Sequence, residues 1–235
     1  MKYIGLFILS LVIITTVKAS CIDGNGQLET KRLELEKFEK LSLSTKSKIF
    51  LYQGPEQKID VIAESNLIEY LSTKIKDGTW SVHFKECVDP TKPVEIHITL
   101  PVIRSLELNG ASDLIASEVI KSEDLEVEVN GSAKLELTLE VKNLETDING
   151  SGDIRYSGSV ESHEIEISGA ADIGAYELKS KHSKIVIRGA GDVKVNVETS
   201  LKIKIFGAGD IKYRGNPDQL EITKYGAGDV KKVPD

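Results

Sequence analysis

The sequence predicts an all-β fold, a parallel β-solenoid preceded by a more irregular β region. A short motif that begins with glycine returns seven times in the second half of the chain, and apolar residues alternate with polar ones around each copy. Alternation with a period of two indicates strands. Units too short to bury their own apolar face, repeated at a nearly constant period, indicate coils stacked on one another. No repeat contains a helical pattern long enough to serve as a crossover.

The repeated motif is Gly-x-x-Asp followed by an aliphatic residue. Its seven copies begin at Gly110, Gly131, Gly150, Gly169, Gly189, Gly207 and Gly226. The fourth position holds Asp113, Asp153, Asp172, Asp192, Asp210 and Asp229, and only the second copy has Lys134 instead. The glycines are 18 to 21 residues apart, which predicts coils of about 19 residues around an interior of Leu, Ile and Val. A sandwich of antiparallel hairpins is the alternative, although it gives no reason for an identical corner at every second strand.

Each motif is expected to form a corner of its coil, and its residues are therefore assigned structural roles. Stacked corners leave room only for small side chains, and we expect the glycines to adopt the positive φ of a sharp bend. The aspartates are expected to accept hydrogen bonds from backbone N–H groups of their own turns. Asn109, Asn130 and Asn149 precede the first three glycines and can stack as an amide ladder.

The repeat solenoid is assigned to residues 101–235, and residues 20–100 are assigned to an N-terminal β region that caps or continues it. Strands are expected at 32–36, 40–44, 48–53, 58–63, 72–76, 80–84 and 94–100. Ser44–Lys48 is a degraded copy of the corner, and Asn66 is expected to cap a single helical turn. At the other end, Lys224, Lys231, Lys232 and Pro234 are expected to block strand addition to the last coil.

Residues 1–19 have the features of a secretory signal peptide, because Lys2 precedes an apolar run that ends before Ala19. The sequence therefore predicts export to the periplasm, the outer cell surface or the medium. The only two cysteines, Cys21 and Cys87, allow two interpretations in an oxidising compartment. A disulfide is favoured over a lipid on Cys21, because Lys18 stands where a lipoprotein signal has an aliphatic residue. Membrane association is expected only with the lipid.

Charge and side-chain distribution argue against several function classes. Loss of the signal peptide removes two lysines and changes the formal net charge from -7 to -9, so no nucleic-acid partner is expected. An enzyme needs an acid and a base in one cleft or a nonrepeating metal cluster, whereas the four histidines are scattered and the aspartates recur at one architectural position. We predict no catalytic residue, metal or cofactor. Calcium between successive corners is the alternative for the aspartates, although calcium-binding β-rolls use a nine-residue period.

Four segments together resemble the putative auto-transporter adhesin, head GIN domain family of Bacteroidetes. They are the Cys21–Gly26 start, the Lys48–Gly54 strand and turn, the Cys87–Pro93 loop, and the GSGDI and GAGDI repeats. The resemblance covers essentially the whole mature chain, with Lys134 and Lys224 as departures from the pattern, and it implies a right-handed parallel β-helix with a role in adhesion.

The expected function is a non-enzymatic surface or periplasmic module that binds a surface glycan or protein. One alternative is a structural or assembly component of the cell envelope, which could be a homo-oligomer. A β-helix enzyme acting on polysaccharides is the less favoured third class.

Overall fold

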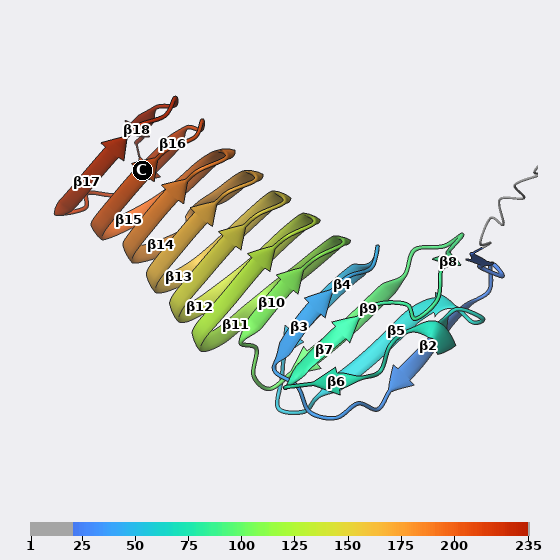
Figure 1. Ribbon diagram of the computed structural model, residues 1–235. Helices are drawn as coiled ribbons and strands as arrows, with labels where there is room; N and C mark the ends of the chain where they lie inside the picture. The colour runs from blue at the N-terminus through green and yellow to red at the C-terminus, as the bar shows by residue number, and fades with distance from the viewer. Residues whose placement is uncertain (1–20, 235) are drawn as a thin grey trace, which may run out of the picture.

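The structure is a computed structural model that describes residues 21–234, and it confirms the predicted β-solenoid (Figure 1). About seven turns lie about 19 residues apart along the chain. The expected signal peptide falls outside the described residues. Within the described part, no helix is long and apolar enough to cross a membrane.

Five long strands form the central coils: β11 (Ala111–Val129), β12 (Ser132–Ile148), β13 (Ser151–Ile167), β14 (Ala170–Ile187) and β15 (Ala190–Ile205). Each pairs in parallel with the next, and the corner motifs are in register, so that Asp153 lies beside Asp172, and Asp172 beside Asp192. Each strand has a first arm, which follows its corner glycine, and a second arm, which leads to the next glycine. Three short strands complete the C-terminal end: β16 (Ile211–Arg214), β17 (Gln219–Lys224) and β18 (Val230–Lys232).

The core is a set of aliphatic columns that run through the coils. Alternate residues of both arms point inward because the side-chain period of a strand is two. The column before the corners consists of Leu108, Val129, Ile148, Ile167, Ile187 and Ile205, each almost fully buried. Full burial of one such side chain contributes roughly 1.5–3 kcal/mol, and stacking gives every coil two neighbours to bury against.

The parallel stack continues into the N-terminal region. Strand β10 (Ser105–Leu108) pairs with β3 (Lys40–Leu43), and β3 pairs with β7 (Thr79–Val82). Strand β4 (Lys48–Gln53) pairs in parallel with β11, so the degraded corner at Ser44–Lys48 stacks beneath the corner at Gly110. The Gly110 N–H donates to the Leu43 carbonyl, which confirms that this segment acts as a corner.

Antiparallel strands then depart from the solenoid pattern. Strand β9 (Glu95–Leu100) pairs with β4 in parallel but with β5 (Lys58–Glu64) in the antiparallel sense, and β5 pairs in the same sense with β2 (Leu28–Leu33). Strand β2 lies earlier than the expected range 32–36, because pairing with β5 and not periodicity determines its position. The remaining strands are short: β1 (Ile22–Asp23), β6 (Ile75–Lys76) and β8 (Val88–Asp89).

Cys21, where the described part of the chain begins, is attached to the loop after β7 by a disulfide to Cys87, so the structure has the favoured pairing. One helical turn is present, a 3-10 helix at Ile68–Tyr70, but the expectation for Asn66 is wrong. Leu67 is the N-cap, and the Asn66 side chain instead donates to the Asp23 carbonyl at 2.9 Å. This residue serves the chain terminus and not the helix.

Candidate binding groove

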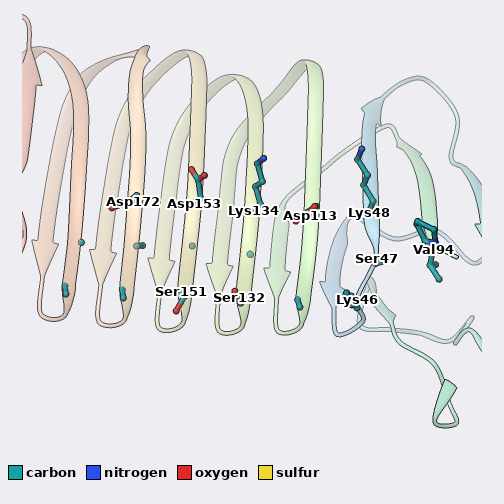
Figure 2. Close-up of a pocket in the computed structure, with 18 of the residues that line it drawn as sticks. Lys46, Ser47, Lys48, Val94, Asp113, Ser132, Lys134, Ser151, Asp153 and Asp172 are labelled. Atoms are coloured by element: carbon teal, nitrogen blue, oxygen red, sulfur yellow. The ribbon is translucent and has the colours of Figure 1, made fainter. Parts of the chain in front are cut away.

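A groove of about 1340 Å³ runs along the stacked corners of the solenoid (Figure 2). Its floor is formed by the small residues of successive motifs, from Ala111 to Gly209, and its closed end by β4 and the loop Asp89–Val94. The motifs recur at one point of each coil, so their small side chains make a continuous hollow instead of isolated pits. We call this hollow the corner groove.

Glycine is required at the first motif position because the backbones of neighbouring coils approach closely there. The expectation that these glycines adopt a positive φ is wrong. None of the seven first glycines has a positive φ; Gly158, Gly215 and Gly228 do. A Cβ on Gly189 would lie 2.0 Å from the Gly169 carbonyl oxygen, and the same clash recurs from Gly131 to Gly226. Gly152, at the third motif position, differs from these glycines. A Cβ added there would have the Ile154 side chain as its nearest contact, at 3.3 Å. Stacking, and not bending, therefore selects the first glycine.

One wall of the corner groove carries a row of charged side chains at the fourth motif position. Figure 2 shows Asp113, Lys134, Asp153 and Asp172 on successive coils, with Lys48 on the neighbouring strand β4. All of them line the groove, and none is buried. Lys48, Asp113 and Lys134 give the row mixed charge near the closed end, and Asp153 and Asp172 make it acidic farther along.

The aspartates do not use the partners expected from the sequence. The Asp192 carboxylate accepts a hydrogen bond from the backbone N–H of Asp210, at 3.0 Å, and the Asp210 carboxylate accepts one from that of Asp229, at 2.9 Å. Asp153 pairs with Arg155 at 3.2 Å. Where such a bond forms, it therefore links one coil to the next instead of closing its own turn. Parallel stacking brings the backbone N–H of the next coil within hydrogen-bonding distance of the aspartate carboxylate. A sequence motif considered as one isolated turn gives no sign of this partner.

The closed end of the corner groove is held by a buried carboxylate that sequence reasoning missed. Glu64 is 1% exposed and accepts from the Thr91 hydroxyl at 2.7 Å and from the Thr91 and Lys92 backbone N–H groups at 2.8 and 3.3 Å. It also accepts from the Gly26 N–H. The Thr91 hydroxyl and these N–H groups lower the pKa of Glu64 below its ordinary value, despite the opposing effect of burial. The only sequence signal is an acidic residue at the end of an alternating strand.

A buried polar cluster occupies the interior behind the charged wall. The Thr146 hydroxyl lies 3.2 Å from both the Tyr156 hydroxyl and His163 Nε2. Burial raises the pKa of Tyr156 and lowers the pKa of His163 to about 3, so this imidazole is neutral at physiological pH. His163 occupies an inward position between Leu144 and Ser183, which the alternation of its strand could have indicated. It does not reach the corner groove.

The asparagine ladder has formed beside the corners. The Asn149 side chain donates to the Asn130 side chain at 3.1 Å, and Asn130 donates to Asn109 at 3.0 Å. Residues 21–234 contain no group of three or more His, Cys, Asp or Glu arranged to hold a metal ion.

A β-solenoid with small-residue corners and a lengthwise groove defines the class of protein: a repeat fold whose stacked turns present long, regular surfaces. The chain belongs to the family described as putative auto-transporter adhesin, head GIN domain, whose model matches residues 37–217.

Solved structures have the same fold. A putative adhesin from Bacteroides fragilis superposes with a TM-score of 0.84 at 22% identity, covering 90% of this chain and 100% of its own. A putative adhesin from Parabacteroides merdae gives 0.72 at 24% identity over 92% and 100%. A putative lipid binding protein from Parabacteroides distasonis gives 0.71 at 21% identity over 90% and 100%. No curated protein matches the chain.

Proposed function

We propose that this chain is an exported, non-enzymatic binding or adhesion module and that it holds an extended segment of a surface glycan or protein in the corner groove. The observation that carries the proposal is the groove itself, a continuous hollow of about 1340 Å³ along the corners of successive coils. Membership of the adhesin family and the Cys21–Cys87 disulfide support it. A secreted chain commonly keeps such a bond in an oxidising compartment.

The dimensions of the corner groove favour an extended ligand. Six corners from Ala111 to Ala208 line it, and at a strand spacing of roughly 4.8 Å they span about 24 Å. That length accommodates about seven residues of an extended peptide, or a short run of sugar rings. The floor of Ala, Ser and Gly allows close approach, and the carboxylates of Asp153 and Asp172 can accept hydrogen bonds from ligand hydroxyl or amine groups.

The proposal is tested by filling the corner groove with one side chain. Ser151 lines the groove, whereas Ser159 is an exposed serine on the same strand outside it. We expect Ser151→Tyr to abolish binding of the mature chain on a glycan array or to immobilised surface proteins, and Ser159→Tyr to leave it unchanged. Equal binding by both variants would place the ligand elsewhere, and no binding by the unmodified chain would contradict the proposal.

A structural or assembly role in the cell envelope is the second candidate, and the last coil favours it. Leu220 and Ile222 of β17 are 46% and 45% exposed, and no described strand follows β17 along the solenoid. An exposed apolar strand edge can accept another strand, and Lys224, which was expected to block such addition, pairs with Asp229 of the same chain and leaves Leu220 and Ile222 uncovered. Seeded growth of end-to-end polymers from purified mature chain would support this role, whereas a dispersed population under the electron microscope would count against it.

A further inference from the structure

The outward side chains of the second arms form a flat face that is divided by charge, and we call it the charged face. Its first four coils carry Glu107, Glu126, Glu128, Glu145, Asp147, Glu164 and Glu166. Its next two coils carry Lys184, Arg188, Lys202 and Lys204, and the last coil carries Glu221 in the column of Lys202. The parallel register places these residues in straight columns, so an acidic patch borders directly on a basic one.

Ion pairs within the chain form at the border between the two patches and also at the far side of the basic patch, where Lys202 pairs with Glu221 at 2.7 Å. Glu164 pairs with Lys184, and Glu166 pairs with Arg188. Within residues 21–234 no basic side chain pairs with Glu145 or Asp147 one coil away. Burial raises the pKa of Asp147, and the carboxylates of Glu145 and Glu128 raise it further, so the acidic patch is under mutual repulsion.

We propose that two copies of this chain associate through their charged faces in antiparallel orientation, so that the acidic coils of β12 and β13 in each lie over the basic coils of β15 and β14 in the other; the outermost contact, Glu126 with the second copy's Glu221, is between like charges. A two-fold axis parallel to the strands, between the coils of Glu164 and Lys184, produces this arrangement. It sets Glu145 and Asp147 opposite the second copy's Lys202 and Lys204. A two-fold axis along the solenoid would instead set acid against acid, so charge selects the antiparallel pair.

Two exposed aromatic rings lie on the edge of the same face. Phe206 and Tyr225 stack with centroids 5.3 Å apart, and they are 48% and 75% exposed. The two-fold axis that aligns the charges places them opposite the second copy's Asn149 and Asn130. The rings would be covered there, and amide N–H groups can donate to aromatic faces. Burial of the two rings thus accompanies the ionic contacts.

The area of the charged face agrees with a specific but reversible pair. Six coils at roughly 4.8 Å and five residues at roughly 3.4 Å give about 500 Å² on each copy, or about 1,000 Å² in total. This lies at the lower end for specific protein pairs, so we expect a dimer that dissociates on dilution and in salt. The corner groove remains open because it lies on the corners and first arms, and a dimer would offer two grooves to one surface.

Charge reversal with exchange of partners tests the proposal. Sedimentation equilibrium of the mature chain should show a monomer–dimer equilibrium whose dissociation constant rises at least about tenfold between about 50 and 500 mM NaCl. The double variants Glu145→Lys with Asp147→Lys, and Lys202→Glu with Lys204→Glu, should each be monomeric. Mixed in equal amounts they should form a heterodimer, because each reversed patch then meets its complement and the native patches still meet.

The control keeps the change in net charge but moves it off the charged face. Lys194 and Lys212 are exposed on first arms, and reversing both to Glu alters the net charge as much as reversing Lys202 and Lys204. We expect this control to dimerise normally, with circular dichroism confirming that every variant is folded. A mature chain that stays monomeric, a control that is equally monomeric, or a mixture that does not associate would each overturn the proposal.

Discussion

Gly189→Ala should destabilise the solenoid severely, because it places one methyl group between two coils. The new Cβ would lie 2.0 Å from the Gly169 carbonyl oxygen and 2.4 Å from that of Ser168. Cβ atoms in real structures essentially never lie within 3.0 Å of such atoms, so the coils must separate locally by about 1 Å. Here the Ala190 N–H donates to the Gly169 carbonyl at 2.9 Å, and the Gly189 N–H donates to Ile167 at 3.0 Å.

The magnitude follows from overpacking and from these weakened hydrogen bonds. Inserting a methyl group into well-packed structure costs about 1–3 kcal/mol, and each lost hydrogen bond costs about 1 kcal/mol more. We expect a loss of about 3–5 kcal/mol for Gly189→Ala. Gly152→Ala is the matched control, because its Cβ would lie 3.3 Å from the flexible Ile154 side chain and 3.7 Å, an ordinary contact, from the Ala133 carbonyl oxygen, and Ala already occupies this motif position in the next coil, at Ala171. It should change stability by less than about 1 kcal/mol.

Urea unfolding followed by circular dichroism measures both variants. Repeat arrays can unfold in stages, so the transition should also be followed by Trp80 fluorescence before a single free energy is assigned. If Gly189→Ala unfolds within about 1 kcal/mol of Gly152→Ala, close coil stacking is not what selects the first glycine.

Three further outcomes are expected. His163 stays neutral when folded, so the free energy of unfolding should fall by about 1.4 kcal/mol per pH unit as the pH drops from about 6.5 towards 3, and His163→Leu should reduce this slope. Asp192→Ala removes one bond between coils and should cost about 1 kcal/mol, whereas a melting temperature that falls with EDTA would reveal a metal. Reduction of Cys21–Cys87, which are 66 residues apart, should cost about 4 kcal/mol in the chain-entropy model, and an unchanged melting temperature would contradict this.

The repeat made the solenoid predictable from the sequence. Gly-x-x-Asp at near-constant spacing fixes where each coil turns, and alternation fixes which residues point inward. Even the degraded corner at Ser44–Lys48 could be found, because Ile49 follows it as an aliphatic residue follows each full copy. The corner motif and the apolar alternation are properties of a single coil, and the stack repeats them in every coil.

Contacts between coils could not be obtained in the same way. The aspartate bonds and the clash that excludes a Cβ at Gly189 both involve the preceding or following coil. When the motif is considered as a single turn, a positive φ explains its glycine and a hydrogen bond within the turn explains its aspartate. The structure replaces both with requirements of the stack.

The same limit applied to the candidate site. The corner groove is closed by the loop Asp89–Val94, whose position depends on three hydrogen bonds from Thr91 and Lys92 to Glu64, a residue distant in sequence. Nothing repeats there, so periodicity gives no information. The non-repeating N-terminal region therefore determines where the groove ends, although the repeats make its floor.

Stacking constrains the columns of this solenoid unequally, and that inequality indicates where function can reside. The inward columns must stay apolar or, as at Thr146, Tyr156 and His163, pair their polar groups internally, and the first glycine must stay free of a Cβ, because each touches neighbouring coils. Side chains in the outward columns are exposed to solvent and contact only the outward side chains of adjacent coils. The sequence there can therefore change from coil to coil at little cost in stability. The change from Asp113 to Lys134 and the change from Glu164 to Lys184 are both in outward columns. The packing of the core does not require such departures from the repeat, which makes the charged wall of the corner groove and the charged face the surfaces where recognition should be tested first.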